Sequence, residues 1–439
     1  MDYTVRIERM AYGPAGIGHL PDGKTVFVDS TVPGDTARVQ IIEDKGRFAR
    51  GRLTALLEPS PHRMREQAPQ ETLCGTAPWQ IMDYGAQLEA KRANITGALV
   101  HGAKMDPAAA EELVAPARAS KQQWNYRNKL ELGAGTDDRG RFIVGFHREQ
   151  SPQLVAVEEC ALAHKAIARA PKALRGAIRY AQGSRDLQIY RIGVRHSTAT
   201  GDLEVALWTP PGAFPRSTFA KTIGEACKAT GVIRVMAHPG KARKIKGVEV
   251  LSGYSSWHEK LAGFDFHTQA PSFFQVNTAQ AEQLVALVRE GLGAVEGMLV
   301  ADLFAGGGTF GIPLAAAGAD VIAVEAAGSS VRDLRANAER NGVQLEVLGG
   351  DAARELADLG SLDALVVDPP RAGLGRDLVG LIADAAPRTL AYVSCDPATW
   401  ARDIALLEAA GYGLKCATPV DMFPQTYHVE IASILEGRR

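Results

Sequence analysis

The last third of the chain alternates short apolar segments with segments of helical periodicity. The apolar segments cover residues 299–304, 320–325, 363–368 and 390–395. They are short and continuous, which is typical of parallel strands buried on both faces. Residues 329–341 and 376–385 fit helices that connect such strands. The alternation predicts an α/β fold with a doubly wound parallel sheet.

Ligands of such sheets bind beyond the carboxyl ends of the strands, so residues at those ends are candidate site residues. The first strand leads into a turn with three consecutive glycines, which allow a backbone to approach a ligand closely. Glu325 follows about 20 residues later, the spacing at which an acid reaches ribose hydroxyls. The turn lacks the G-x-G-x-x-G pattern of pyrophosphate sites. S-adenosylmethionine fits this pattern, although glycine-rich turns also bind dinucleotides or simply reverse the chain.

Three further side chains stand at predicted strand ends. Asp368 precedes two prolines, which hold its carboxylate at the edge of the sheet. Cys395 precedes a proline and a predicted helix, where backbone dipoles would favour a thiolate. Glu430 precedes the apolar segment 431–435, where burial would raise its pKa and make it a usable base. Taken singly, each has an inert alternative, namely a structural turn, a buried thiol or a solvated carboxylate.

The first 60 residues read as short β-strands separated by glycine turns. Strands are predicted at 4–9, 25–28, 36–43 and 48–57, with Gly16 and Gly18 as turn residues. This pattern predicts a small β-barrel. One predicted hairpin carries Lys45, Arg47, Arg50 and Arg52, which would contact phosphates or simply be solvated.

The charge is unevenly distributed along the chain. Residues 269–439 hold 12 basic against 22 acidic residues, which gives −10, whereas residues 1–268 hold 37 against 28, which gives +9. A basic part joined to an acidic part suggests that the basic part faces a polyanion, although uneven solvation is the plain alternative. One basic cluster consists of Lys241, Arg243, Lys244 and Lys246.

The composition favours the cytoplasm. The five cysteines lie far apart in the chain, which is no disulfide framework. The first residues show no secretory signal, and no apolar segment approaches the roughly 20 residues of a membrane helix. We therefore expect a cytoplasmic protein without a membrane partner.

Five motifs occur in the order found in the RNA 5-methyluridine methyltransferases. They are FFQVN at 273–277, DLFAGGGT at 302–309, DPPR at 368–371, SCDP at 394–397 and DMFPQTYHVE at 421–430. Residues 10–18, with 27–28 and 33–35, resemble a TRAM domain, and 126–129 with 145–146 resemble the central domain of that family. The resemblance implies an OB-like TRAM barrel at 1–60 and an α+β central domain with RNA contacts at 61–268. It implies a Rossmann-like class I methyltransferase domain at 269–439.

The resemblance also implies a reaction and its residues. A methyl group would pass from S-adenosylmethionine to carbon 5 of a uridine in RNA, with Cys395 as nucleophile and Glu430 as general base. The positions that match the methyl-donor site are Gln275, Phe304, Thr309, Glu325, Asp351 and Asp368. Thr309 stands where many members have Asn.

Many relatives hold an iron–sulfur cluster on four cysteines, and this chain departs from that pattern. Cys74 and Cys160 match two of the positions, whereas Ala68 and Ala77 occupy the other two. Two thiolates do not satisfy a four-cysteine site. We therefore expect no cluster and no metal, and hypothesise that apolar packing or other contacts replace it.

Several alternatives remain open for the substrate. The TRAM-like barrel favours 23S ribosomal RNA, because bacterial tRNA-specific relatives usually lack it, but some tRNA-modifying members have one. A non-catalytic RNA-binding or chaperone protein and a small-molecule methyltransferase are the alternatives of other classes. We expect a monomer with RNA as its partner.

Overall fold

The computed structural model describes residues 2–68, 74–137, 139–148, 151, 153–240 and 244–437, so Lys241 and Arg243 of the basic cluster lie outside it. The chain forms two compact units, which we call the first and the second unit. The first consists of Met1–Thr72, Thr76–Gln123 and Asp368–Arg439, and the second of Leu73–Gly75 and Trp124–Val367. Each unit therefore combines segments that lie far apart in the sequence.

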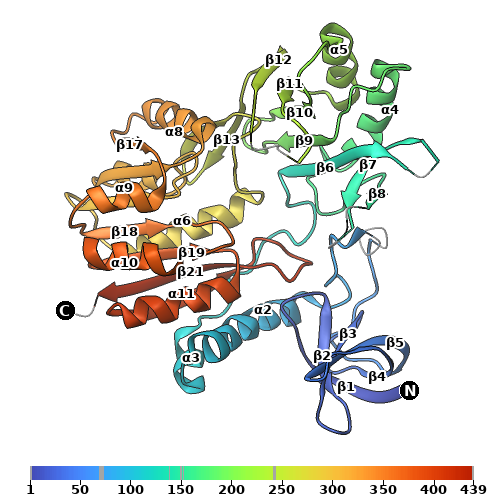
Figure 1. Cartoon of the computed structure of the whole chain (residues 1–439), viewed down its shortest axis with the longest axis vertical. Helices are drawn as coiled ribbons and strands as arrows, with labels where there is room; N and C mark the ends of the chain where they lie inside the picture. The colour runs from blue at the N-terminus through green and yellow to red at the C-terminus, as the bar shows by residue number, and fades with distance from the viewer. Residues whose placement is uncertain are drawn as a thin grey trace. The chain divides into compact units, whose positions relative to one another are not determined.

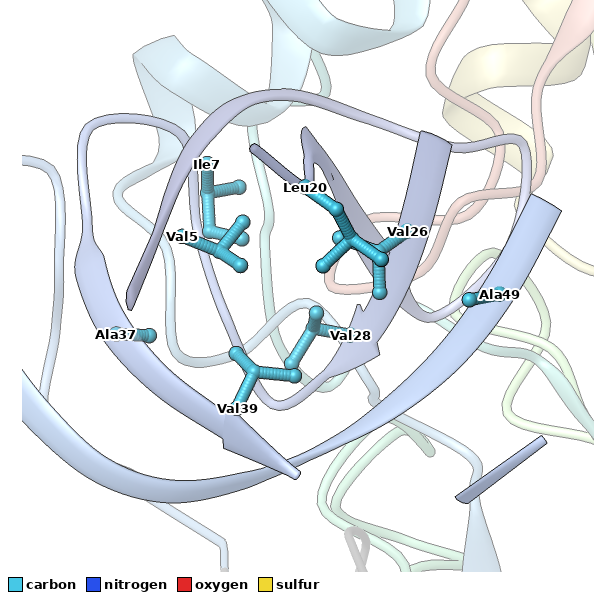
Figure 2. Close-up of a cluster of buried hydrophobic side chains, with 8 residues drawn as sticks. All are labelled: Val5, Ile7, Leu20, Val26, Val28, Ala37, Val39 and Ala49. Carbon is cyan, nitrogen blue, oxygen red and sulfur yellow. The ribbon is translucent and has the colours of Figure 1, made fainter. Parts of the chain in front are cut away.

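The N-terminal strands of the first unit close into a barrel. They are β1 (Asp2–Met10), β2 (Ala15–His19), β3 (Thr25–Asp29), β4 (Thr36–Asp44) and β5 (Phe48–Glu58). Their order around the barrel is β1-β2-β3-β5-β4. Figure 2 shows the apolar side chains that fill the interior, namely Val5, Ile7, Leu20, Val26, Val28, Ala37, Val39 and Ala49. The predicted barrel is confirmed.

Strand β2 corrects one prediction, because Gly16 and Gly18 lie within a strand and not in turns. A Cβ atom at Gly18 would collide with the Arg6 carbonyl, and one at Gly16 with the Thr31 hydroxyl. The two glycines therefore allow close packing inside the barrel, which is a recognised use of glycine in strands.

The remaining strands of the first unit form an antiparallel group. Strand β21 (Glu430–Gly437) pairs with β19 (Thr389–Ser394) on one side and with β20 (Tyr412–Val420) on the other. The helices are α2 (Tyr84–Ala98), the π-helical turn η1 (Leu99–Ala103), α3 (Pro107–Leu113), α10 (Gly375–Ala385) and α11 (Pro397–Ala409). Helix α11 packs against α2, α10 and β20, and Figure 1 draws α10, α11 and these strands in orange and red.

The larger sheet of the second unit has the strand order β12-β11-β10-β9-β6-β7-β8. Its strands are β6 (Lys129–Thr136), β7 (Phe142–His147), β8 (Leu154–Ala156), β9 (Arg191–His196), β10 (Leu203–Thr209), β11 (Gly231–Met236) and β12 (Gly247–Gly253). Helices α4 (Ala170–Gln182) and α5 (Arg216–Cys227), green in Figure 1, pack against each other and against this sheet. A hairpin of β13 (Trp257–Leu261) and β14 (Phe264–Thr268) follows, and then α6 (Thr278–Leu292).

Four parallel strands complete the second unit in the order β17-β16-β15-β18. They are β15 (Leu299–Leu303), β16 (Asp320–Glu325), β17 (Glu346–Gly349) and β18 (Ala364–Val367), with the helices α7 (Gly311–Ala316), α8 (Gly328–Arg340) and α9 (Ala352–Asp358) between them. All four residues of β18 are buried, as expected for a strand covered on both faces. The predicted α/β fold with parallel strands is confirmed.

Within the described residues, no helix has the length and apolar character needed to cross a membrane.

Candidate active site

The pairing of β19 with β21 brings Cys395 and Glu430 together. The strands are antiparallel, and Ser394 lies opposite Ile431. Because Cys395 follows Ser394 and Glu430 precedes Ile431, both side chains lie at the same end of the strand pair. Glu430 is only 5% exposed, whereas Cys395 is half-buried. A half-buried thiol and a buried carboxyl group therefore lie at the same end of this strand pair.

Asp368 and Arg371 belong to the same charged group. Burial raises the pKa of Asp368 to about 7. Burial, and then the charge of Asp368, raises the pKa of Glu430 well above its usual range, and Arg371 opposes this shift. The expected upward shift of the Glu430 pKa is confirmed, and a carboxylate with a raised pKa accepts a proton more readily.

The expectation that backbone dipoles favour a thiolate at Cys395 is wrong. Burial, followed by the charges of Glu430 and Asp368, raises the pKa of the thiol to about 11, and Arg371 opposes this only in part. Asp396 caps α11 by accepting a hydrogen bond from the Thr399 amide at 2.9 Å, so its own negative charge offsets the helix dipole. The raised pKa therefore favours the protonated thiol of Cys395 at neutral pH.

A turn of the barrel also reaches this site. Tyr12, between β1 and β2, donates a hydrogen bond from its hydroxyl to the main-chain carbonyl of Cys395 at 3.2 Å. Its ring lies edge-on to Tyr427, with the centroids 5.5 Å apart, and Tyr427 in turn lies 4.2 Å from the His428 ring. Sequence reasoning missed Tyr12, because nothing in the spacing of residues connects position 12 with position 395.

Buried polar side chains of α2 hold the loop that leads to Glu430. The Lys91 ammonium pairs with Asp421 and donates to the Phe423 carbonyl at 3.1 Å. The side chain of Gln87 donates to Gln425 Oε1 at 2.9 Å and accepts from the Gln425 amide at 3.0 Å. Sequence reasoning missed these contacts as well. The only available signal was that Gln87 and Lys91, four residues apart, share the buried face of α2.

The residues assigned to the methyl donor are divided between the units. Asp368 lies in the first unit with Cys395 and Glu430. The second unit holds the other five, namely Gln275, Phe304, Thr309, Glu325 and Asp351.

Glu325 and the glycine-rich turn are joined by hydrogen bonds within the second unit. The Glu325 carboxylate accepts hydrogen bonds from the amides of Gly306 at 2.9 Å and Ala327 at 2.6 Å. Phe304 has a φ of 64°, which is uncommon for a residue with a side chain and often marks a functional site. A Cβ atom at Gly306 would meet no neighbour within 4 Å, so the turn borders open space. A nucleoside without phosphates fits a backbone turn with an acid beside it.

Two of the remaining donor residues have structural contacts of their own. The main-chain carbonyl of Gln275, a buried residue, accepts a hydrogen bond from the Asn128 side chain at 2.9 Å. Asp351 is exposed and caps α9 by accepting from the amides of Ala353 and Arg354. These contacts orient both residues.

The chain matches two protein families. The model of the tRNA (Uracil-5-)-methyltransferase family matches residues 83–438, and that of the TRAM domain matches residues 2–54.

Known proteins resemble the chain over almost its whole length. An uncharacterized RNA methyltransferase of Gloeobacter violaceus is 34% identical over 99% of this chain and 96% of its own. One of Thermosynechococcus vestitus is 33% identical over 98% and 97%. The crystal structure of Pyrococcus abyssi tRNA (uracil-54, C5)-methyltransferase, in complex with S-adenosyl-L-homocysteine, is 26% identical with a TM-score of 0.75. The similarity covers 98% of this chain and 99% of that one.

Proposed function

The chain belongs to the tRNA (uracil-5-)-methyltransferase family, and from this premise we propose that Cys395 is its nucleophile and Glu430 its general base. As a member, it is an S-adenosylmethionine-dependent RNA uracil-5 methyltransferase with a TRAM barrel. The observation that carries the proposal is the register of β19 and β21, which brings the half-buried thiol of Cys395 to the same end of the strand pair as the buried carboxyl group of Glu430.

The chemistry of uracil explains why a thiol and a carboxylate are needed. Carbon 5 is a poor nucleophile, but addition of the Cys395 sulfur to carbon 6 turns the ring into an enolate. S-adenosylmethionine supplies a methyl group on a sulfonium, which carbon 5 can attack. Glu430 then removes the hydrogen from carbon 5, the bond between sulfur and carbon 6 breaks, and the ring double bond returns. One proton is released for each methyl group transferred.

The charges around the site support this division of roles. The thiol proton has to leave before the sulfur attacks, because the Cys395 pKa is raised to about 11. Glu430 has a raised pKa, so it holds the proton taken from carbon 5 more firmly than a solvated glutamate would. Arg371 opposes the shifts of both groups and so limits the accumulation of negative charge.

We propose that the methyl donor contacts the side chains that the resemblance assigns to it. They are Gln275, Phe304, Thr309, Glu325, Asp351 and Asp368. The hydrogen bonds that tie Glu325 to the glycine-rich turn support this assignment, because they leave carboxylate lone pairs for ribose hydroxyls.

For the substrate we propose 23S ribosomal RNA, with transfer RNA as the second candidate. A specific observation favours the second. The similarity to a tRNA methyltransferase covers 98% of this chain, so a counterpart of the barrel exists in a protein that acts on tRNA. We propose that residues 1–60 and 61–268 bind RNA, that 269–439 carry out methyl transfer, and that the protein works in the cytoplasm as a monomer.

Exposed basic residues of the barrel support RNA binding there. The hairpin of β4 and β5 exposes Lys45, Arg47, Arg50 and Arg52. Lys45 and Arg50 lie 2.6 and 3.9 Å from Glu43, so Arg47 and Arg52 are the stronger candidates for phosphate contacts.

The residues present do not fit the iron–sulfur cluster of many relatives. Ala68 and Ala77 are buried and offer no ligand atom, while Cys74 and Cys160 supply only two thiols. Among the described residues, no group of three or more His, Cys, Asp or Glu side chains could hold a metal ion. The Gln80 side chain accepts from the Ala68 amide and donates to the Ala68 carbonyl, both at 2.9 Å, which supports our hypothesis that other contacts organise this segment.

Covalent trapping tests the mechanism. RNA with 5-fluorouridine should form a stable adduct in the presence of S-adenosylmethionine. With fluorine in place of hydrogen at carbon 5, there is no proton for the base to remove, so the bond between sulfur and carbon 6 does not break. Mass spectrometry should find the adduct in the native protein but not in Cys395→Ala. The matched control is Cys416→Ala, which removes another half-buried cysteine and should still form the adduct. Turnover by Cys395→Ala, or the absence of an adduct in the native protein, would refute the mechanism. Mapping 5-methyluridine in ribosomal and transfer RNA of a strain without the protein would decide between the two RNAs.

A further inference from the structure

The barrel contributes a side chain to the reacting centre. Tyr12 stands in the turn between β1 and β2, and its hydroxyl donates to the main-chain carbonyl of Cys395, a residue 383 positions away. Both residues belong to the first unit. An RNA-binding barrel that only held the substrate would need no contact with the nucleophile.

The turn that carries Tyr12 is itself held in place. The Ala11 amide donates to the Ala15 carbonyl at 2.9 Å and so closes the turn. The indole of the fully buried Trp79 donates to the Gly13 carbonyl at 3.0 Å, and the Asn94 side chain donates to the Ala11 carbonyl at 3.4 Å. A tyrosine in such an anchored turn presents its hydroxyl at a fixed position.

The Tyr12 hydroxyl also keeps its proton. Burial, followed by the charge of Asp396, raises its pKa above the usual range for tyrosine, and the charges of Cys395 and Glu430 act in the same direction, opposed by Arg371. A phenol that stays neutral remains a hydrogen-bond donor at neutral and moderately alkaline pH.

We propose that Tyr12 is a positioning residue for the nucleophile, so that the barrel acts on the rate of attack as well as on RNA binding. This inference rests on the proposed role of Cys395. A hydrogen bond to the Cys395 carbonyl fixes the peptide plane on one side of the Cα atom, and hence the direction of the bond that carries the sulfur. The rate of attack on carbon 6 depends on this direction, because a misplacement of about 1 Å in a reacting group can cost two orders of magnitude in rate.

The competing role for Tyr12 is an RNA contact, since its ring packs near Tyr427 and His428. The two roles affect different constants. A positioning residue changes the rate of adduct formation at saturating RNA, whereas an RNA contact changes the dissociation constant.

The test compares Tyr12→Phe with Tyr412→Phe. Both variants remove a hydroxyl that donates to a main-chain carbonyl, and Tyr412 donates to Ile382 at 3.3 Å from the far end of the β20–β21 pair. The two measurements are the single-turnover rate of adduct formation on saturating 5-fluorouridine RNA and the dissociation constant for unmodified RNA. We expect Tyr12→Phe to form the adduct roughly 5- to 10-fold more slowly, in line with the loss of one hydrogen bond, with the dissociation constant within about twofold of native. Tyr412→Phe should match the native protein in both.

Two results would overturn the inference. One is a native rate of adduct formation in Tyr12→Phe, and the other is weaker RNA binding with an unchanged rate at saturation. Neither result touches the proposed function, which fails separately if Cys395→Ala still turns over.

Discussion

The buried ion pair between Lys91 and Asp421 gives the sharpest test of how the site is supported. Both side chains are fully buried, and the Asp421 carboxylate also accepts from the Tyr84 hydroxyl at 2.7 Å. Lys91→Met keeps the length of the side chain but removes the cation and the hydrogen bond to the Phe423 carbonyl. Breaking a buried pair from one side costs about 3–5 kcal/mol. Because Tyr84 still donates to Asp421, we expect the free energy of unfolding to fall by about 3 kcal/mol.

A double-mutant cycle in urea separates this effect from simple loss of packing. Removing both charges leaves no uncompensated ion. The double variant Lys91→Met, Asp421→Asn should therefore lower the free energy of unfolding by only about 1–2 kcal/mol, less than either single variant does. The matched control is Lys415→Met, which breaks the exposed pair of Lys415 with Glu436 at 3.1 Å on the β20–β21 pair and should cost at most about 1 kcal/mol. If the double variant loses the sum of the two single losses in free energy of unfolding, to within about 0.5 kcal/mol, then Lys91 and Asp421 do not stabilise each other as a buried ion pair.

Neutralising Glu430 by Glu430→Gln should lower the Cys395 pKa from its value of about 11, because a negative neighbour disfavours the thiolate; the pH profile of iodoacetamide alkylation measures this, and an unchanged profile would contradict it. The same variant should raise the melting temperature at neutral pH. When the pKa of a carboxyl group is raised by folding, the folded protein loses stability as the pH rises above the pKa of that group in the unfolded chain, whereas glutamine does not titrate. The gain in melting temperature should therefore vanish below about pH 4. A gain that persists at lower pH would point to a change in packing instead. Anaerobically purified protein should contain no stoichiometric iron. About four iron atoms per chain would contradict the inference that Ala68 and Ala77, at two of the four ligand positions, leave the protein without an iron–sulfur cluster.

Local sequence patterns placed the strands and helices that were predicted to within a residue or two at each end. The predicted strand 320–325 coincides with β16, because a run of apolar residues between turn residues is a local property. The strand near Cys395 was predicted at 390–395, one residue too late in the chain, since β19 covers Thr389–Ser394. Strand β2 was missed because its glycines look like turn residues until their neighbours in the barrel are known.

The sequence by itself determined the order of the elements and the strand ends at which Cys395, Asp368 and Glu430 stand, since apolar periodicity and prolines act within a few residues. The tertiary structure decided the electrostatics and the support of the site. The Cys395 pKa is raised and not lowered, because burial disfavours the thiolate and the charges of Glu430 and Asp368, which come from other segments, add to this effect. Tyr12 and Lys91 contact partners 383 and 330 positions away, and only the pairing of distant segments creates such contacts.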